Sequence, residues 1–440
     1  MIHKKIENQT AYAGVIGLGY VGLPLAVTMA KAGFSVTGID VDGRKIECIQ
    51  DGISVVSDVA SEDLASFVHR GQIHATTDYR ILRELDTINI CVPTPLRKSK
   101  DPDMSFIISA VDEIAQYLRK DQLVILESTT YPGTTEEIVL PKLEKSGLQV
   151  GKDFFLAFSP ERIDPGNPTY STANTTKIVG GITPTCTQVA QLFYKQFIQE
   201  VHAVSSTRVA EMAKLLENTF RSVNIGLVNE MALMCDQMGL DVWEIVDAAA
   251  TKPFGFMPFY PGPGLGGHCI PVDPHYLSWK AKTYEFHARF IELASEINGS
   301  MPEYVLGKII DALNQQQKAV NGSKILIMGV AYKKNVGDVR ESPAIDVIRM
   351  LAQRGGEILY HDPYVPELEV EEVVPRNRQP VRYLRAELTA ELVQSVDCVV
   401  IMTDHADIDY AWLVDHAAAV VDTRNATKPI AQNQNKVLKI

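Results

Sequence analysis

The feature that most restricts the fold is the segment Gly17–Gly22, GLGYVG, which follows the apolar run AGVI and precedes a helical pattern. Gly17 permits a tight turn, Gly19 lets a pyrophosphate approach the backbone, and Gly22 lets helix and strand pack closely. A phosphate bound there would lie at a helix N-terminus, which supplies N–H groups and a partial positive charge. The segment therefore predicts a dinucleotide-binding α/β unit at the start of the chain.

Short apolar runs alternate with helical stretches through the first third of the chain. Helical patterns such as YVGLPLAVTMAKAG and IISAVDEIAQYLRK separate the runs. This alternation is typical of a parallel sheet with helices on both faces. We expect strands at 13–17, 34–40, 86–92, 122–128, 154–159 and 177–181.

A long helix interrupts this pattern near residue 205. About 30 residues there carry a helical apolar period without proline, with Ser205 or Ser206 as the N-cap and Gly239 as the end. Short apolar runs and helices return at Gly322. The expected fold class is α/β, with two Rossmann-like doubly wound domains joined by a central helical domain. The expected domain boundaries are 1–204, 205–320 and 321–440.

Asp40 indicates which dinucleotide the first domain binds. It ends the second expected strand, 18 residues beyond Gly22, where its carboxylate can accept hydrogen bonds from ribose hydroxyls and would repel a 2′-phosphate. We therefore expect NAD rather than NADP, a preference that Arg44 weakens slightly. The alternative is an α/β protein whose turn glycines bind no cofactor. Further expected cofactor contacts are Tyr20 and Val21 in the turn, and Thr94 and Thr129 after later strands, where hydroxyls also occur in ordinary turns.

Charge and cysteine spacing argue against several classes of protein. The formal net charge of −12 disfavours non-specific binding of nucleic acid. No apolar run approaches the roughly 18 residues that a membrane helix needs, and no signal-peptide pattern opens the chain, so we expect a cytoplasmic protein without membrane contact. The six cysteines include no CxxC pair and no histidine at zinc-like spacing, so we expect no metal site.

Cys269 stands apart from the other cysteines because it follows a run of glycines and is flanked by prolines, in GPGLGGHCIPVDP. The glycines at 264, 266 and 267 would leave room for a substrate carbon beside the thiol. His268 is discounted as the base of a Cys–His pair because neighbouring side chains usually diverge. Asp273, four residues on, is a candidate for orienting water or a lysine.

Lys214 and Asn218 are four residues apart on the expected long helix and share a face. Glu211 lies one turn before Lys214, so the simplest interpretation is an exposed ion pair. The functional alternative is a lysine and an amide directed at one developing oxyanion.

Taken together, these motifs resemble the UDP-glucose/GDP-mannose dehydrogenase family of nucleotide-sugar dehydrogenases. The matching segments cover nearly the whole chain in the family's order: VIGLGYVGLPLA, CVPTP, SPER, EMAKLLENTFRSVN, GPGLGGHCIPVDP and GVAYKKNVGDVRESP. The resemblance implies an N-terminal NAD domain, a central helical region that forms a homodimer or higher oligomer, and a C-terminal UDP-binding domain. It also implies that NAD oxidises a sugar C6 alcohol twice, to a carboxylate.

The resemblance assigns a covalent role to Cys269, whose thiolate would form first a thiohemiacetal and then a thioester with the sugar. It gives Lys214, Asn218 and Asp273 the handling of oxyanions and water, and Glu161 a part in thioester hydrolysis. Thr129 would lie near the reacting centre. The expected contacts to UDP-sugar or cofactor are Glu161, Arg162, Lys214, Asn218, Phe259, Tyr260, Gly266, Lys333 and Arg340.

Two departures from the UDP-glucose enzymes bear on the substrate. A second glutamate of that group falls on Pro165, and no arginine stands between Lys252 and Cys269, where the chain reads PFGFMPFYPGPG. Less positive charge and more aromatic surface suit a bulkier C2 substituent such as N-acetyl. We therefore expect UDP-N-acetylglucosamine as substrate, with UDP-GalNAc, UDP-ManNAc and UDP-glucose as alternatives.

Two other classes of protein remain as alternatives. The 6-phosphogluconate and β-hydroxyacid dehydrogenases share the Rossmann domain and the lysine–asparagine pair but oxidise once and lack the cysteine loop. Cys269 and residues 322–440 argue against them. A non-enzymatic NAD-binding or scaffold protein would leave the combination of Lys214, Asn218, Cys269 and Asp273 unexplained.

Overall fold

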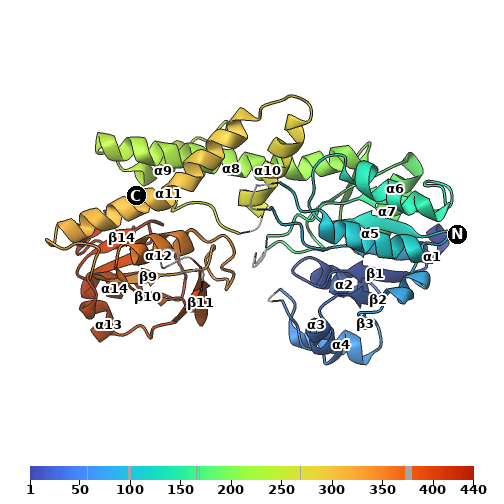
Figure 1. Ribbon diagram of the computed structural model, residues 1–440, viewed down its shortest axis with the longest axis horizontal. Coiled ribbons are helices and arrows are strands. Elements are labelled where there is room, and N and C mark those ends of the chain that lie inside the picture. The colour runs from blue at the N-terminus through green and yellow to red at the C-terminus, as the bar shows by residue number, and fades with distance from the viewer. Residues whose placement is uncertain (57, 98–100, 165–166, 168, 268, 372–378) are drawn as a thin grey trace. The chain divides into compact units, whose positions relative to one another are not determined.

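The computed structural model describes residues 1–56, 58–97, 101–164, 167, 169–267, 269–371 and 379–440 (Figure 1). The expectations for Pro165 and His268 concern residues outside these ranges. The chain forms two compact units, each with its own sheet. The first unit comprises Met1–Glu217 and His275–Phe286, and the second comprises Asn218–Pro274 and His287–Ile440.

The first unit is built on an eight-stranded sheet in the order β3-β2-β1-β4-β5-β6-β7-β8. Its first six strands follow the Rossmann order, which confirms the expected fold class. β7 runs antiparallel to β6, contrary to the all-parallel expectation, whereas the other neighbours are parallel. The strands are β1 Tyr12–Ile16, β2 Ser35–Ile39, β3 Ile73–Thr76, β4 Thr87–Ile90, β5 Leu123–Leu126, β6 Phe155–Phe158, β7 Lys177–Gly181 and β8 Val201–Ala203.

Helices cover the faces of this sheet (Figure 1). The central strands β4, β5, β6 and β7 are buried along their whole length. A cluster of rings from Phe34, Phe193, Tyr194 and Phe197 packs beside them. The helices are α1 Ile2–Glu7, α2 Gly22–Lys31, α3 Gly43–Gln50, α4 Ser61–His69, α5 Ser105–Tyr117, α6 Leu140–Leu143 and α7 Pro184–Tyr194.

The second unit contains a five-stranded parallel sheet in the order β10-β9-β13-β14-β15. This is the 2-1-3-4-5 order of flavodoxin-like sheets, whose ligands bind where the strand order reverses, here between β9 and β13. A hairpin of β11 (Glu367–Val370) and β12 (Val381–Leu384) adjoins it. The sheet strands are β9 Lys324–Met328, β10 Glu357–His361, β13 Cys398–Ile401, β14 Val420–Asp422 and β15 Val437–Lys439.

Helix α11 (Arg289–Asn314) packs its buried face against this second sheet and against α12 (Pro343–Gln353). The indole of Trp243, on α9 (Val242–Ala250), donates to the backbone carbonyl of Ile440 at 3.0 Å. These contacts make the helical region after residue 218 part of the second unit. The other helices that lie wholly in the second unit are α13 Ala390–Ser395 and α14 Tyr410–His416.

Two helices contribute residues to both units, α8 (Thr207–Met238) and α10 (Cys269–Lys282). The expected cap of the long helix is confirmed, because Ser206 Oγ accepts the backbone N–H of Val209. Its expected end is also confirmed, because Gly239 has a φ of +69°, a left-handed conformation that favours glycine.

Candidate active site

The glycine turn after β1 has the geometry that a dinucleotide requires. A Cβ on Gly17, whose φ is +93°, would lie 2.5 Å from the carbonyl oxygen of Cys91, and one on Gly22 would lie 1.8 Å from the carbonyl of Gly17. Among the described residues, no atom lies within 4 Å of a Cβ built on Gly19, and no side chain caps the N-terminus of α2. Gly17 and Gly22 thus serve packing, while Gly19 leaves the backbone open to a pyrophosphate.

Asp40 anchors this turn from the end of β2. Its Oδ2 accepts the backbone N–H of Leu18 at 2.8 Å, and its Oδ1 accepts that of Asp42 at 3.0 Å. The ammonium of Lys45 lies 3.4 Å from Oδ2. Each carboxylate oxygen can accept a second hydrogen bond, so the carboxylate keeps capacity for ribose hydroxyls. The turn, the open helix end and Asp40 together fit NAD.

The loops after β4 and β5 hold the second half of α10 on the first unit. The hydroxyl of Tyr276 donates to the carbonyl of Thr94, whose side chain is buried. The rings of Tyr131 and Trp279 pack with centroids 5.0 Å apart. Thr129, which we expected near the reacting centre, lies half-buried in the loop after β5. The helix that begins with Cys269 is therefore tied at its far end to the edge of the sheet that carries the glycine turn.

Glu161, after β6, belongs to a buried charge cluster that the sequence interpretation missed. The ammonium of Lys177, at the start of β7, lies 2.6 Å from Glu127 Oε2 and 3.0 Å from Glu161 Oε2. Glu127 Oε1 accepts hydrogen bonds from Asn89 at 2.6 Å and from the Tyr194 hydroxyl at 2.7 Å. The sequence signal that could have revealed this cluster was a charged residue at one end of each of two otherwise apolar strands. Glu127 comes directly after β5, and Lys177 is the first residue of β7.

Arg162, expected to contact substrate, is already engaged within the first unit. Its guanidinium lies 2.7 Å from Glu217 Oε1 on α8 and donates to the carbonyl of Thr176 at 2.7 Å. These contacts join the SPER loop to the long helix. The geometry therefore gives Arg162 a structural contact that sequence spacing did not indicate.

The expected ion pair between Glu211 and Lys214 is wrong. Glu211 is fully buried, and its carboxylate accepts hydrogen bonds from the backbone of Gly133 and from the backbone and hydroxyl of Thr135, at 2.5–2.9 Å. Burial raises the pKa of Glu211 to about 7, although these hydrogen bonds act to lower it. Lys214 is only 7% exposed and has no hydrogen-bond or ion-pair partner within the described residues of its unit. A nearly buried ammonium without a counter-ion is available for a ligand's negative charge.

Asn218 lies one turn beyond Lys214 and belongs to the second unit. Its side-chain amide donates to the carboxylate of Asp273, so these two predicted site residues are in direct contact. Cys269 is the first residue of α10, and its side chain is exposed. A helix N-terminus stabilises negative charge and hence a thiolate.

The glycines before Cys269 also serve packing within the second unit. A Cβ on Gly266 would lie 2.6 Å from Tyr332 Cβ, and one on Gly267 would lie 2.8 Å from the ring of Tyr332. The N–H of Gly267 also donates to the carbonyl of Arg340 at 2.9 Å. The missing side chains thus admit the segment 332–343.

That segment follows β9 and carries the cations expected near the phosphates. Lys333 is half-buried, and Arg340 pairs with Asp338 at 2.6 Å. Arg424, after β14, was missed, although a Cβ on Gly262 would lie 2.7 Å from its guanidinium. The signal for Arg424 was its place directly after an apolar strand, at the edge where ligands of parallel sheets bind.

Asp362, at the end of β10, fixes the start of this segment. Its Oδ2 accepts the backbone N–H groups of Val330 and Ala331 at 2.8 and 3.0 Å and lies 3.0 Å from Nε2 of His405. Nδ1 of His405 accepts the N–H of Asn335, so Nε2 carries the proton that Asp362 receives. Hydrogen bonds to the carboxylate hold the pKa of Asp362 below its usual range although burial acts to raise it.

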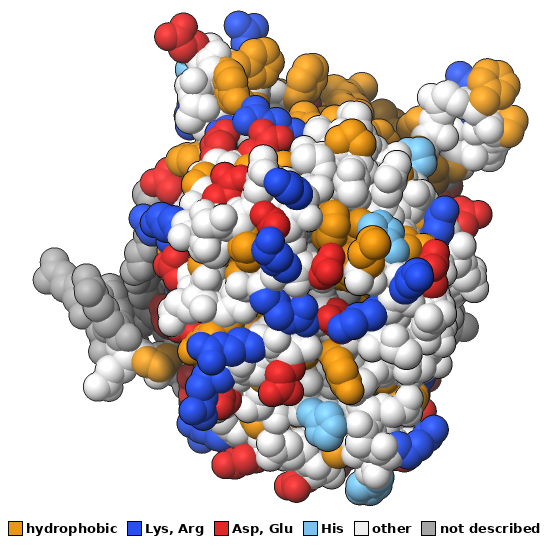
Figure 2. Space-filling view, turned by 90° about the vertical axis from the view of Figure 1, so that its right-hand side faces the viewer, with side chains coloured by type: hydrophobic (Ala, Val, Ile, Leu, Met, Phe, Trp, Pro, Cys, Tyr) orange, Lys and Arg blue, Asp and Glu red, His pale blue; other side chains and the backbone are white. Residues whose placement is uncertain are grey.

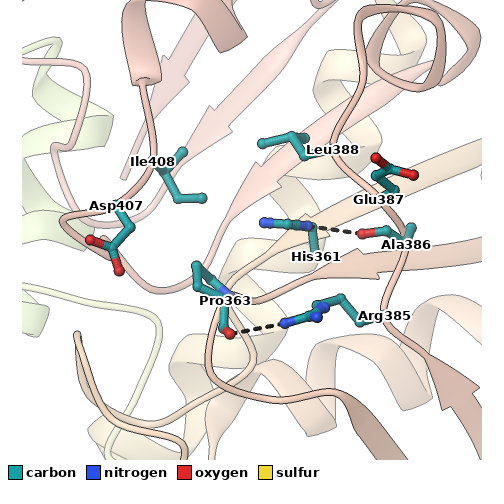
Figure 3. A pocket seen from close by; sticks show the side chains of 8 residues that line it. All are labelled: His361, Pro363, Arg385, Ala386, Glu387, Leu388, Asp407 and Ile408. Atoms are coloured by element: carbon teal, nitrogen blue, oxygen red, sulfur yellow. Dashed lines mark hydrogen bonds between the residues drawn. The ribbon is translucent and has the colours of Figure 1, made fainter.

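A cavity of about 650 Å³ opens beside this network, at the carboxyl end of β10 (Figure 3). Arg385 donates to the carbonyl of Pro363 at 2.9 Å, and His361 Nδ1 lies 2.9 Å from the carbonyl of Ala386. The other lining residues are Glu387, Leu388, Asp407 and Ile408. One arginine beside two carboxylates does not favour a diphosphate, so the cations of the segment after β9 are the better phosphate ligands.

The aromatic residues expected to contact the sugar pack on the helices of the second unit. The ring of Phe259 lies 5.7 Å from that of Phe220 on α8. Tyr260 stacks on Trp243 at 5.9 Å, and its hydroxyl donates to Asp247 at 2.9 Å. These contacts orient the loop before Cys269.

Within the described ranges, no group of three or more histidine, cysteine or acidic side chains is arranged to hold a metal ion. None of the helices described has both the length and the apolar character needed to cross a bilayer.

Comparison with known proteins identifies the family. Three domains of the UDP-glucose/GDP-mannose dehydrogenase family match the chain: the NAD binding domain over residues 12–198, the central domain over 208–300 and the UDP binding domain over 326–429. A UDP-N-acetyl-D-glucosamine 6-dehydrogenase from Pseudomonas aeruginosa is 38% identical over 80% of this chain and 82% of its own length. An NDP-N-acetyl-D-galactosaminuronic acid dehydrogenase from Ralstonia solanacearum is 36% identical over 91% and 92% of the two chains.

A solved structure supports the same assignment. The UDP-D-ManNAc dehydrogenase from Pyrococcus horikoshii superposes with a TM-score of 0.85 and 32% identity, over 94% of this chain and 96% of that one. The resemblance seen in the motifs and the expectation of NAD are thereby confirmed. The chain belongs to the UDP-glucose/GDP-mannose dehydrogenase family and is an NAD-dependent nucleotide-sugar dehydrogenase.

Proposed function

We propose that the enzyme oxidises the C6 hydroxyl of a UDP-N-acetylhexosamine, with UDP-N-acetylglucosamine as the preferred substrate, to the uronic acid. The observation that best supports this reaction is the arrangement at α10, where an exposed cysteine begins the helix and Asp273 contacts Asn218. The relatives support an N-acetylated sugar, because their names cover N-acetylglucosamine, N-acetylgalactosaminuronic acid and N-acetylmannosamine. The absence of arginine between Lys252 and Cys269 favours the same group of substrates.

Cys269 supplies the covalent step. Bound NAD⁺ accepts one hydride in each of the two oxidations. After the alcohol has become an aldehyde, the Cys269 thiolate adds to the carbonyl carbon, and the oxygen takes up a proton to give a thiohemiacetal. Loss of that proton and of the remaining C–H hydride leaves a thioester. Water then adds to the carbonyl carbon and gives up its two protons, the C–S bond breaks, the thiolate departs and the sugar is released as the carboxylate.

Lys214 and Asn218 stabilise the oxyanions of these steps. Lys214 is nearly buried and lacks a counter-ion within its unit, so its charge is available to the substrate oxygen. Asp273 accepts a hydrogen bond from the side-chain N–H of Asn218 and so fixes the orientation of that amide. Glu161 and Thr129 act on the hydrolytic water and at the reacting centre, respectively.

The two nucleotides bind at the two sheets. We assign NAD to the turn Gly17–Gly22 with Asp40, Thr94 and Thr129, and UDP to the segment after β9 with Lys333. Arg340 contributes to the cofactor side, as the motif resemblance implies. We retain the boundaries 1–204, 205–320 and 321–440 as functional domains for NAD, catalysis with dimerisation, and UDP.

A homodimer through the central helices is part of the proposal. Large apolar side chains stay exposed along one helix, and a stripe of this kind marks a protein interface. The stripe on α8 comprises Val209, Met212, Leu216, Phe220, Leu227, Met234 and Met238. A second copy of the same helix is the occupant we propose, and the molar mass in solution tests it.

We place the enzyme in the cytoplasm. None of the six cysteines, all of which lie in the described ranges, forms a disulfide. Thiols that stay reduced are typical of that compartment. The face of the molecule in Figure 2 carries acidic and basic side chains intermixed, which does not favour an extended nucleic-acid or membrane surface.

The test is the amount of NADH formed per sugar consumed, measured with UDP-GlcNAc, UDP-GalNAc, UDP-ManNAc and UDP-glucose in parallel. We expect two NADH per UDP-GlcNAc and slower turnover of the others. Two NADH per UDP-glucose with UDP-GlcNAc inert would keep the mechanism and overturn the substrate assignment. One NADH per sugar would remove the covalent role of Cys269.

A further inference from the structure

Lys177 lies in an unusual place for a lysine. It begins the buried strand β7, its side chain is 4% exposed, and its ammonium contacts Glu127 and Glu161 at 2.6 and 3.0 Å. The ammonium also lies 5.5 Å from the centre of the Tyr194 ring. Two carboxylates and one ammonium leave a net charge of −1 in the interior of the first unit.

Such a cluster is hard to explain as a device for stability. Burying ions costs several kcal/mol each, and apolar side chains of similar volume often replace buried ion pairs without loss of stability. Both oxygens of Glu127 are occupied, one by Lys177 and the other by Asn89 and Tyr194. The side chain of Glu127 is 0% exposed and that of Glu161 is 13% exposed, so of the two carboxylates only Glu161 is accessible to water.

Glu161 is held at three points in the same cluster. Its Oε1 accepts the backbone N–H groups of Arg162 and Ile163 at 2.6 and 2.8 Å, and its Oε2 faces Lys177. Burial alone would raise the pKa of Glu161, but Lys177 and the two N–H groups hold it below its usual range. The result is a carboxylate with one orientation that stays charged at neutral pH.

We propose that Lys177 is a positioning residue for Glu161 and is itself held in place by Glu127. It fixes the direction in which Glu161 presents its oxygens and keeps the carboxylate charged while the enzyme turns over. This inference rests on the proposed function, in which Glu161 acts on the water that hydrolyses the thioester. Lys177 itself needs no contact with substrate or cofactor for this role.

The test compares the wild type with the double variant Lys177→Met/Glu127→Gln. The double variant keeps the buried net charge at −1, so Glu161 loses its cation without a second carboxylate beside it. We expect kcat to fall about 10- to 100-fold with little change in KM. Intact-mass measurement during turnover should show more enzyme carrying a covalently bound sugar, because hydrolysis of the thioester has slowed.

The pH profile gives a readout that a structural role would not move. Without Lys177, burial raises the pKa of Glu161, so activity should be lost at a higher pH as the solution is acidified. The other titratable groups in the cluster are Tyr194 and Cys91, whose pKa values burial raises, and Glu127, which the double variant removes. The guanidinium of Arg162 stays charged and pairs with Glu217.

A single variant keeps the proposal testable if the double variant does not fold. Glu127→Gln removes the carboxylate that competes for Lys177, so Glu161 should stay charged to a lower pH. The acid limb of its kcat profile should move in the opposite direction, to lower pH. An unchanged acid limb in this variant would overturn the proposal.

Arg119→Met is the matched control. Arg119 lies 2.8 Å from the buried carboxylate of Asp86, which also binds Lys5. Asp86 precedes β4 and so lies at the amino ends of the parallel strands, whereas Glu127 lies at their carboxyl ends. Its loss should lower the melting temperature and leave kcat and the pH profile unchanged. A folded double variant that matched the wild type in kcat and pH profile would overturn the proposal. Failure of the wild type to oxidise any UDP-sugar would instead remove the proposed function.

Discussion

The two sheets of this chain share one construction and differ in how they would hold a phosphate. In each, an aspartate that follows or ends the second strand accepts N–H groups from the loop after the first strand: Asp40 from Leu18, and Asp362 from Val330 and Ala331. In each, the first loop glycine has a positive φ and no room for a Cβ.

The difference begins directly after those glycines. In the first unit, α2 starts at Gly22, five residues after Gly17, so a helix N-terminus faces the ligand. In the second unit, α12 starts only at Pro343, and the longer segment carries Lys333 and Lys334. One loop thus offers backbone N–H groups to a pyrophosphate, and the other offers cationic side chains.

The largest expected effect is on the chemical step and not on nucleotide binding at either sheet. Cys269→Ser should reduce acid production at least about 10³-fold, because a serine hydroxyl cannot replace the thiolate as nucleophile and leaving group. Binding of NAD and of UDP should persist, since Cys269 lies in neither nucleotide loop. Steady-state NADH formation and calorimetric titration measure the two properties. Full activity in this variant would refute the thioester scheme.

The next effect tests the anchor of the second sheet. Asp362→Asn places an amide against three backbone N–H groups and His405, so some of these donors lose their acceptor at a cost of roughly 1–3 kcal/mol each. We expect about a tenfold loss of UDP affinity and a lower melting temperature, with NAD affinity unchanged. Equal losses for both nucleotides would show that the two loops are not independent.

The matching change in the first sheet should be milder. Asp40 accepts only two backbone N–H groups and keeps a weak contact with Lys45, so Asp40→Asn disturbs the turn less. NAD affinity should fall several-fold, and NADP should bind better because a negative charge near the 2′-phosphate is gone. Titration with both dinucleotides checks this. An unchanged ratio of NAD to NADP affinity would remove the assigned ribose contact.

The smallest effect concerns the stability of the first unit. Burial raises the pKa of Glu211 to about 7, above its usual value of 4.5. Between these two pH values the unfolded chain loses this proton while the folded protein keeps it, so stability falls as the pH rises. Glu211→Gln cannot ionise, so its melting temperature relative to the wild type should rise between pH 5 and pH 8. A constant difference across that range would contradict the shifted pKa.

Features set by neighbours along the chain were predictable from the sequence. The glycine turn, the cap at Ser206 and the helix end at Gly239 depend on local backbone geometry and appear as expected. The short strands β3 (IHAT) and β8 (VHA) were missed, because a histidine interrupts each of them and leaves no apolar run.

Features set by contacts between distant segments were not predictable. Spacing suggested that Glu211 pairs with Lys214, but its partners come from a loop more than 70 residues away. The Glu127–Lys177–Glu161 cluster joins residues after β5, at β7 and after β6, and no single stretch of sequence reveals it. Nothing local indicates that the glycines before Cys269 also make room for Tyr332, which lies more than 60 residues further along the chain.

The measurement that tests the central claim most directly is a crossed titration of NAD and UDP into two variants, Gly22→Ala and Lys333→Met. A Cβ at position 22 would lie 1.8 Å from the carbonyl of Gly17 and must distort the first loop, whereas Lys333 belongs to the second. The account predicts that Gly22→Ala loses NAD and keeps UDP, while Lys333→Met weakens UDP and keeps NAD. Loss of UDP in Gly22→Ala, or of NAD in Lys333→Met, would contradict the division of the two nucleotides between the two sheets.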